Sequence, residues 1–158
     1  MQDKNFSIHE ARDTKEINDA FSLAEKVFME YEAPSFQQRG VDSFLDYLWG
    51  KRVREMIADG NFRVWVCYAN NELVGMLALR EACHISLAFI RGDFHRQGIG
   101  RMLYSEAKRF ALDMETEVIT VNASEYGIPF YKAMGFHETD MQQCTDGIIY
   151  TPMEAIIQ

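Results

Sequence analysis

Two spacings of hydrophobic and polar residues alternate along this chain of 158 residues. Apolar residues recur every three to four positions, as on one face of a helix, at residues 14–31, 41–60 and 99–114. Alternating or short apolar runs, typical of strands, occur at residues 6–11, 61–69, 72–80, 83–91 and 117–123. Strands therefore precede, separate and follow the helices, which predicts a fold of the mixed α/β (α+β) class.

Capping and helix-breaking residues predict where the helices begin and end. Asp13 with Glu16 three residues later resembles a capping box at the start of the first helix, and Pro34 forbids its continuation. Gly50 weakens the second helical stretch, which is thus either one weakened helix or two shorter ones. Residues 126–136 predict a further short helix, closed by Gly135.

Turn residues predict how the strands are joined. Asn70 and Asn71 tolerate the positive φ of a tight turn, so residues 61–81 are expected to form an antiparallel hairpin. Asp146 and Gly147 predict a second hairpin in the C-terminal tail. The helix between residues 83–91 and 117–123 is long enough for a parallel crossover. The sheet is therefore expected to be mostly antiparallel, with one parallel pair at its centre.

Composition favours a globular protein. Hydrophobic residues make up 47% of the chain and aromatic residues 13%, which argues against disorder. No apolar run reaches membrane-spanning length, and the first residues lack the pattern of a signal peptide. Cys67, Cys83 and Cys144 form no paired motif, which argues against a disulfide framework. We expect a single domain over residues 1–158, located in the cytoplasm.

The charge balance limits the classes of partner. A formal net charge of −8 works against binding to nucleic acid, where phosphates favour a basic surface, and against binding to membrane surfaces. A cationic substrate such as an amine would be attracted weakly. Solubility alone explains an acidic balance equally well.

The stretch "HRQGIGR", residues 95–101, is the first candidate for chemistry, because it places two glycines where a strand meets a helix. A dinucleotide fingerprint would need a third glycine where Leu103 stands, and no P-loop string occurs. Gly98 and Gly100 would leave backbone N–H groups free to bind an anion such as a pyrophosphate, with added contacts from Arg96 and Arg101. Alternatively, the glycines only permit a tight turn.

The stretch "TVNASEYGIPFYKAMGF", residues 120–136, contains the second motif. Together, the two stretches resemble the GNAT superfamily of N-acetyltransferases. The pattern of that family runs [QR]-x-x-G-x-[GA] at the start of one helix and N-x-x-[AS]…[FY]-Y-x-x-x-G-F one crossover later. His95 departs from the family's Gln or Arg, which leaves open which side chain contacts phosphate. The resemblance implies a mostly antiparallel sheet of about seven strands, flanked by about four helices.

The resemblance also implies a reaction, the direct transfer of an acetyl group from acetyl-CoA to a primary amine, without a metal. Asn122 would hydrogen-bond the pantetheine arm, and Tyr131 would donate a proton to the departing thiolate. A phenol suits this role because it stays protonated at neutral pH. The other positions implied to bind coenzyme A are the backbone groups of Phe89, Ile90, Arg91, Gln97, Gly98, Ile99, Gly100 and Arg101, and the side chain of Arg96.

The incoming amine must lose a proton, and a base with a pKa near neutrality serves best. His84 lies at a position where some members of the family carry a catalytic Glu or His, and histidine ordinarily has a suitable pKa. The alternative is a histidine that only pairs with a neighbouring strand. Glu81 is the next candidate for a direct or water-mediated role.

The region between the first two helices covers the acceptor pocket in this family. Its candidate substrate-binding residues are Glu30, Tyr31, Glu32 and Phe36, which could hold an amine by charge and aromatic contact. Alternatively, the acids are solvated surface residues. The acceptor would be a small-molecule amine or an amine of a protein, and a homodimer through the last strands is plausible. A different class also stays open, a non-catalytic module that binds or senses acyl-CoA.

Overall fold

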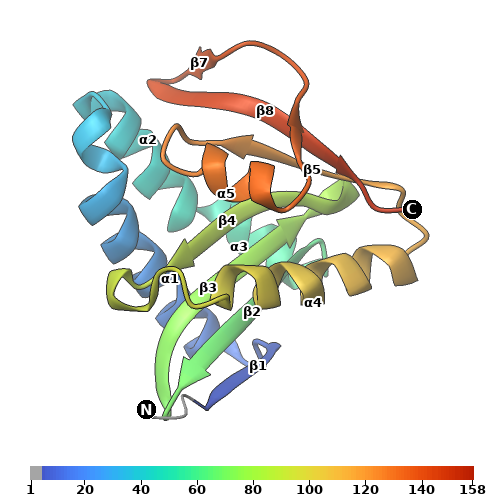
Figure 1. The fold of residues 1–158 in the computed structure, drawn as a ribbon. Coiled ribbons are helices and arrows are strands. Elements are labelled where there is room, and N and C mark those ends of the chain that lie inside the picture. The colour runs from blue at the N-terminus through green and yellow to red at the C-terminus, as the bar shows by residue number, and fades with distance from the viewer. Residues whose placement is uncertain (1–4) are drawn as a thin grey trace.

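The computed structural model describes residues 5–158 as a sheet with helices on both faces (Figure 1). The strands are β1 (Phe6–Glu10), β2 (Phe62–Ala69), β3 (Glu72–Arg80), β4 (His84–Ile90), β5 (Val118–Ala123), β6 (His137–Glu138), β7 (Gln143–Thr145) and β8 (Ile148–Ile156). The α-helices are α1 (Thr14–Tyr31), α2 (Gln38–Leu48), α3 (Lys51–Ala58), α4 (Ile99–Asp113) and α5 (Ile128–Ala133). No helix in this part of the chain is long and apolar enough to cross a membrane.

The sheet confirms the predicted mixed topology. Its strand order is β1-β2-β3-β4-β5-β8-β6, with β7 paired to β8, and every pair is antiparallel except β4 with β5. The parallel pair is joined through α4, as expected for the central crossover. The sheet has eight strands where about seven were predicted, because the tail after α5 folds into three strands, two of them very short.

The helices form two layers, with α1, α2 and α3 behind the sheet and α4 and α5 in front of it in Figure 1. Each layer buries its own hydrophobic core. Phe21, Phe28 and Leu48 belong to the core under α1 to α3, and Leu103 and Tyr131 to the core under α4 and α5. The predicted helical spacing thus places one apolar face of each long helix on the sheet.

Local signals explain the helix boundaries. The Asp13 side chain accepts a hydrogen bond from the Glu16 backbone N–H at 2.9 Å, which caps α1. The second helical stretch is two helices, and the break lies at Gly50. A Cβ atom at Gly50 would collide with the carbonyl oxygen of Asp46. The glycine therefore allows the chain to leave α2 and begin α3 directly.

The C-terminal hairpin forms one wall of the later site. Asp146 and Gly147 have φ of 54° and 81°, as the predicted turn requires. This turn docks on α2, where the Ser43 hydroxyl donates to the Asp146 carbonyl oxygen at 2.7 Å. Gly40 packs directly against Gly147, so neither position has room for a side chain. The docking holds the hairpin of β7 and β8 beside α2.

The two central strands separate part-way along their length. β4 and β5 pair only at His84 with Thr120 and at Ile85 with Val121. The register between β3 and β4 shifts between Ala78 and Leu79, which places a β-bulge in β4 directly after Ile85. The bulge therefore lies where β4 and β5 stop pairing. Beyond Ile85, β4 has no partner on its β5 side within residues 5–158, so an open strand edge runs to Ile90.

Candidate active site

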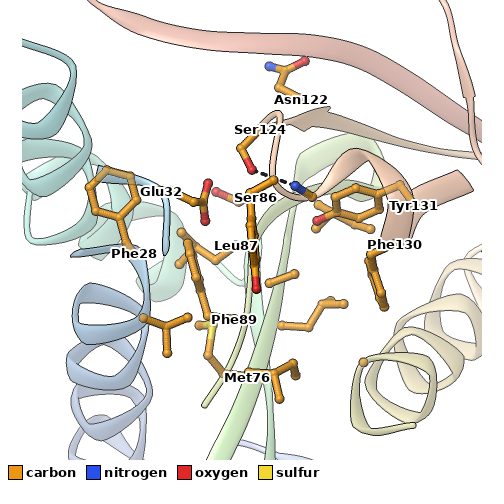
Figure 2. Close-up of a pocket in the computed structure, with 18 of the residues that line it drawn as sticks. Phe28, Glu32, Met76, Ser86, Leu87, Phe89, Asn122, Ser124, Phe130 and Tyr131 are labelled. Atoms are coloured by element: carbon orange, nitrogen blue, oxygen red, sulfur yellow. Dashed lines mark hydrogen bonds between the residues drawn. The ribbon is translucent and has the colours of Figure 1, made fainter. Parts of the chain in front are cut away.

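A cavity of about 820 Å³ follows the gap between β4 and β5. Its walls come from the C-terminal end of α1, from α2 and α3, from β3 and β4, from the start of α4, and from the segment that joins β5 to α5 (Figure 2). Residues 148–150 of β8 close another side. The cavity therefore connects the two helical layers through the sheet and brings together both stretches that the sequence singled out.

The N-terminus of α4 opens into this cavity. Gly98 is the N-cap residue, with φ of 84° and no side chain that caps the helix. The first hydrogen bond inside α4 runs from the Met102 N–H to the Gly98 carbonyl oxygen at 3.0 Å. The preceding N–H groups, at residues 98–101, have no acceptor within the helix. Since Arg96 and Arg101 line the same part of the cavity, this end favours an anion such as a phosphate.

Glycine is favoured at the two positions of the turn for different physical reasons. A Cβ atom at Gly98 would meet nothing within 4 Å, so its positive φ alone favours glycine there. A Cβ atom at Gly100 would lie 2.5 Å from the Phe130 ring, so glycine is needed for α4 to approach α5. Only the first glycine leaves open space at the helix N-terminus.

His95, which departs from the family pattern, is tied to the end of β4. Its Nε2–H donates to the Ile90 carbonyl oxygen at 2.7 Å, and its Nδ1 lies 3.3 Å from the Tyr126 hydroxyl. These two contacts of the imidazole stabilise the turn between β4 and α4. The structure accordingly gives His95 a positioning role in that turn.

The open edge of β4 presents particular backbone groups to the cavity. The Arg91 N–H donates to the Val74 carbonyl oxygen at 2.8 Å, so Arg91 faces β3. Because ladder groups alternate along a strand, Phe89 also faces β3, whereas Ala88 and Ile90 face the gap, with the Ile90 carbonyl oxygen already bonded to His95. The sequence singled out Phe89, Ile90 and Arg91 but not Ala88. The orientation depends on the strand register, which no local motif encodes.

Tyr131 lies on the α5 side of the cavity. Its ring packs edge-on against Phe130 and Phe136, at centroid distances of 5.1 and 5.4 Å. Burial is the main cause that raises the pKa of the Tyr131 hydroxyl, and the nearby Glu32 carboxylate raises it further. The phenol therefore stays protonated at neutral pH, which is the state a proton donor needs.

Glu32 faces Tyr131 across the cavity from the end of α1 (Figure 2). Burial raises the pKa of this carboxyl, and a hydrogen bond from Ser124 partly opposes that shift. The Ser124 Oγ in turn accepts the Gly127 N–H at 3.1 Å. The sequence predicts Glu32 as a substrate-binding candidate, but its burial opposite Tyr131 depends on the tertiary fold.

His84 lines the cavity near the point where β4 and β5 separate. Its Nδ1 lies 2.8 Å from the Thr120 hydroxyl oxygen. Burial, with the positive charge of Arg80 as a second cause, lowers the pKa of His84 to about 4. The imidazole is therefore neutral at pH 7 but has a low affinity for a proton.

Several predicted residues lie outside the cavity lining. Glu30 and Glu81 are exposed, and the Tyr31 ring stacks on Tyr126 with its hydroxyl packed against Gly92. The Arg91 side chain pairs with Asp93 at 2.7 Å and Glu72 at 3.3 Å.

The other predicted positions lie at or near the cavity. Phe36 lines it, as do Ile99 at the start of α4 and Asn122 on β5. The Asn122 amide points away from Tyr131 in Figure 2. The Gln97 side chain donates to the Asp93 carbonyl oxygen at 3.3 Å, so it is turned toward the preceding loop.

Comparison with known families decides between the interpretations of this cavity. The family described as the acetyltransferase (GNAT) domain matches residues 32–157, which is most of the chain. The chain belongs to the GNAT N-acetyltransferases. The peptidyl-lysine N-acetyltransferase YjaB of Salmonella typhimurium is 32% identical over 115 residues, covering 69% of this chain and 77% of that protein.

Solved structures agree on the GNAT fold. A GCN5-related N-acetyltransferase from Rhodopseudomonas palustris has a TM-score of 0.79 at 13% identity, covering 95% of this chain and 94% of that one. The PaiA N-acetyltransferase of Thermoplasma acidophilum, solved with coenzyme A, has a TM-score of 0.75 at 16% identity, covering 96% and 99%. The fold and enzyme family predicted from the two motifs are thus confirmed.

Metal-ligating side chains are dispersed in the part of the chain that the structure describes. No three His, Cys, Asp or Glu residues come together there in a group that could hold a metal ion.

Proposed function

We propose that this GNAT enzyme transfers an acetyl group from acetyl-CoA to a primary amine in the gap between β4 and β5. The observation that carries the proposal is the cavity, which joins the anion-favouring start of α4 to Tyr131 and Glu32 along an open strand edge. The uncapped helix N-terminus suits the pyrophosphate, and the free backbone groups of β4 suit the amides of the pantetheine arm.

The proposed residues divide the proton transfers between them. The amine nitrogen attacks the thioester carbonyl carbon, an N–C bond forms, and the C–S bond breaks. Glu32 takes the proton that the amine must lose, and Tyr131 supplies the proton that the departing sulfur gains. The open N–H groups of β4 are placed to stabilise the negative charge that develops on the carbonyl oxygen.

Glu32 is the proposed base because its environment favours proton uptake. A pKa raised by burial brings this carboxyl closer to neutrality, whereas the pKa of His84 is lowered to about 4. Glu81 is exposed and outside the cavity lining. His84 is the competing candidate, and variants of the two residues separate their roles.

Release of free thiol from acetyl-CoA, measured over a panel of amines, tests the proposed function. A thermal shift with coenzyme A is recorded alongside. We expect coenzyme A to raise Tm and at least one class of amine to support continuous thiol release and an acetylated product. Binding without turnover over a broad panel would instead identify a non-catalytic module that binds acyl-CoA.

Substitution of Gly98 tests the anion site. Gly98→Val should abolish the rise in Tm that coenzyme A produces, because it strains the backbone and fills space at the N-terminus of α4. Gly60→Val is the matched control, since Gly60 has φ of 78°, equally open surroundings and no place in the cavity lining. Both variants should lose similar stability without ligand. A preserved coenzyme A shift in Gly98→Val would show that the turn is only structural.

We further propose a cytoplasmic location. Cys67, Cys83 and Cys144 are all free, and the first two are buried. Free thiols persist in a reducing compartment, which supports this location. The homodimer through the last strands stays a prediction.

A further inference from the structure

The arginines of this acidic chain fall into two groups. Outside the cavity, each has a partner: Arg12, Arg39, Arg63, Arg91 and Arg109 pair with carboxylates, and Arg54 lies over the rings of Phe21 and Trp49. Within residues 5–158, the arginines with neither kind of partner are Arg52, Arg80, Arg96 and Arg101. All four line the cavity, whereas Glu32 is the single acid among the described lining residues.

Two of these arginines are explained by the proposed function, and two are not. Arg96 and Arg101 lie at the start of α4, where the phosphates of coenzyme A are expected. Arg52 and Arg80 belong to α3 and to the end of β3, on the opposite side of the cavity. Arg80 is half-buried and Arg52 is exposed. Unpaired guanidinium groups beside a partly enclosed cavity favour an anionic ligand.

The backbone brings Arg52 and Arg80 to the same end of the cavity. Arg80 is the strand partner of both His84 and Phe62. Asn61, next to Phe62, donates its N–H to the Met56 carbonyl oxygen at 2.8 Å. Met56 and Arg52 both line the cavity and lie four residues apart on α3, so they share one face of that helix.

Apolar side chains fill the walls between this end and Glu32. They come from α1, α2, α3, β3 and β4 and belong to the core behind the sheet: Phe28, Phe44, Met56, Met76, Leu87 and Phe89. The polar side chains in this part of the wall, the Tyr47 and Ser86 hydroxyls, lie 2.6 Å apart and hydrogen-bond each other. This part of the cavity therefore suits an apolar group rather than a second polar one.

We propose that the acceptor is a small amine whose carboxylate lies at the far end of an apolar body, as in an apolar ω-amino acid. The inference rests on the proposed acetyl transfer. The carboxylate binds Arg52 and Arg80, the apolar body packs on the aromatic and methionine walls, and the amine lies at Glu32 opposite Tyr131. A lysine side chain of a protein, the substrate class named for YjaB, is the competing acceptor, and it would bring no carboxylate to the two arginines.

Matched pairs of amines test this assignment. Thiol release from acetyl-CoA is measured with ε-aminocaproate and p-(aminomethyl)benzoate, with their carboxamides, and with a lysine peptide blocked at both ends. Rates are expressed per concentration of free amine, because replacement of the carboxylate by a carboxamide also shifts the pKa of the amine. We expect kcat/KM for each acid to exceed that for its carboxamide by about 10- to 100-fold, the usual size of hydrogen bonds to charged groups.

Variants of the two arginines should remove that preference. Arg52→Gln and Arg80→Gln should each lower the ratio of acid to carboxamide by about tenfold, while carboxamide turnover changes little. Arg80→Lys keeps a positive charge and should retain part of the preference. Arg109→Gln is the control, because Arg109 is exposed, pairs with Glu106 and lies outside the cavity lining. The coenzyme A thermal shift reports that each variant is folded.

The outcomes separate this inference from the proposed function. Carboxamides or the lysine peptide used as well as the acids, or a preference unchanged in both glutamine variants, overturn the carboxylate site and leave acetyl transfer intact. Absence of thiol release with every amine overturns the proposed function and this inference with it. If neither glutamine variant folds, the ratio of acid to carboxamide in the parent enzyme decides.

Discussion

Tyr131→Phe should lower kcat by about 10²- to 10⁴-fold, the usual contribution of general acid catalysis. The substitution keeps the ring and its contacts with Phe130 and Phe136, so Tm should change little. It removes the hydroxyl that would give a proton to the departing thiolate. Coenzyme A affinity should change far less than kcat, because the lost interaction matters mainly in the transition state. Steady-state kinetics and a thermal shift on the purified variant check both expectations.

Tyr104→Phe is the matched control for this variant. Tyr104 is also buried and also packs on Phe136, at a centroid distance of 5.5 Å, but it does not line the cavity. Its kcat should equal that of the parent. A Tyr131→Phe enzyme within about twofold of the parent would remove Tyr131 from the chemistry, provided that a viscosity test shows that product release does not limit the parent.

Glu32→Gln should lower kcat/KM at pH 7 by a similar factor, because the amine loses its proton acceptor. The loss should shrink as pH rises, since more of the amine is then already unprotonated. Glu30→Gln is the control, because Glu30 lies two residues earlier, exposed and outside the cavity lining. A loss in His84→Ala with a Glu32→Gln enzyme near the parent rate would assign the base to His84 instead.

The same variant should be more stable than the parent at neutral pH. Burial raises the pKa of Glu32 in the folded state above its ordinary value of 4.5. Between the ordinary pKa of Glu32 and its raised pKa in the folded state, the folded protein binds more protons than the unfolded chain. The free energy of unfolding therefore falls as pH rises through this range. Glutamine removes that cost, so Tm of Glu32→Gln should exceed that of the parent at pH 7 and approach it at pH 4. A lower Tm for the variant at pH 7 would show that Glu32 is a structural group.

Local signals in the sequence predicted the elements of this fold because their causes are local. The capping residue Asp13, the break at Gly50 and the turns at residues 70–71 and 146–147 act through neighbouring residues, and the structure confirms them. The anion-favouring start of α4 was predictable for the same reason, since it requires only a strand, a glycine and a helix in order.

The arrangement inside the cavity depends on long-range pairing, and the sequence does not encode it locally. The separation of β4 from β5 after Ile85 opens the gap, and the register of β4 with β3 decides that Ala88 faces it. The burial of Glu32 requires the end of α1 to meet Ser124 on another element. Arg80 and Arg52 lie at the same end of the cavity because β2 pairs with β3 and leads back to α3, and no local motif encodes that placement. Electrostatic shifts such as the lowered pKa of His84 follow only from these contacts.

A crystal structure of the enzyme with coenzyme A shows whether the thioester lies in the gap between β4 and β5, opposite Tyr131. We expect the pyrophosphate at the N–H groups of residues 98–101, the pantetheine arm along Ala88 and Ile90, and the thiol sulfur in contact with the Tyr131 hydroxyl. Coenzyme A bound outside this gap, or with its sulfur directed away from Tyr131, would overturn the proposed mechanism.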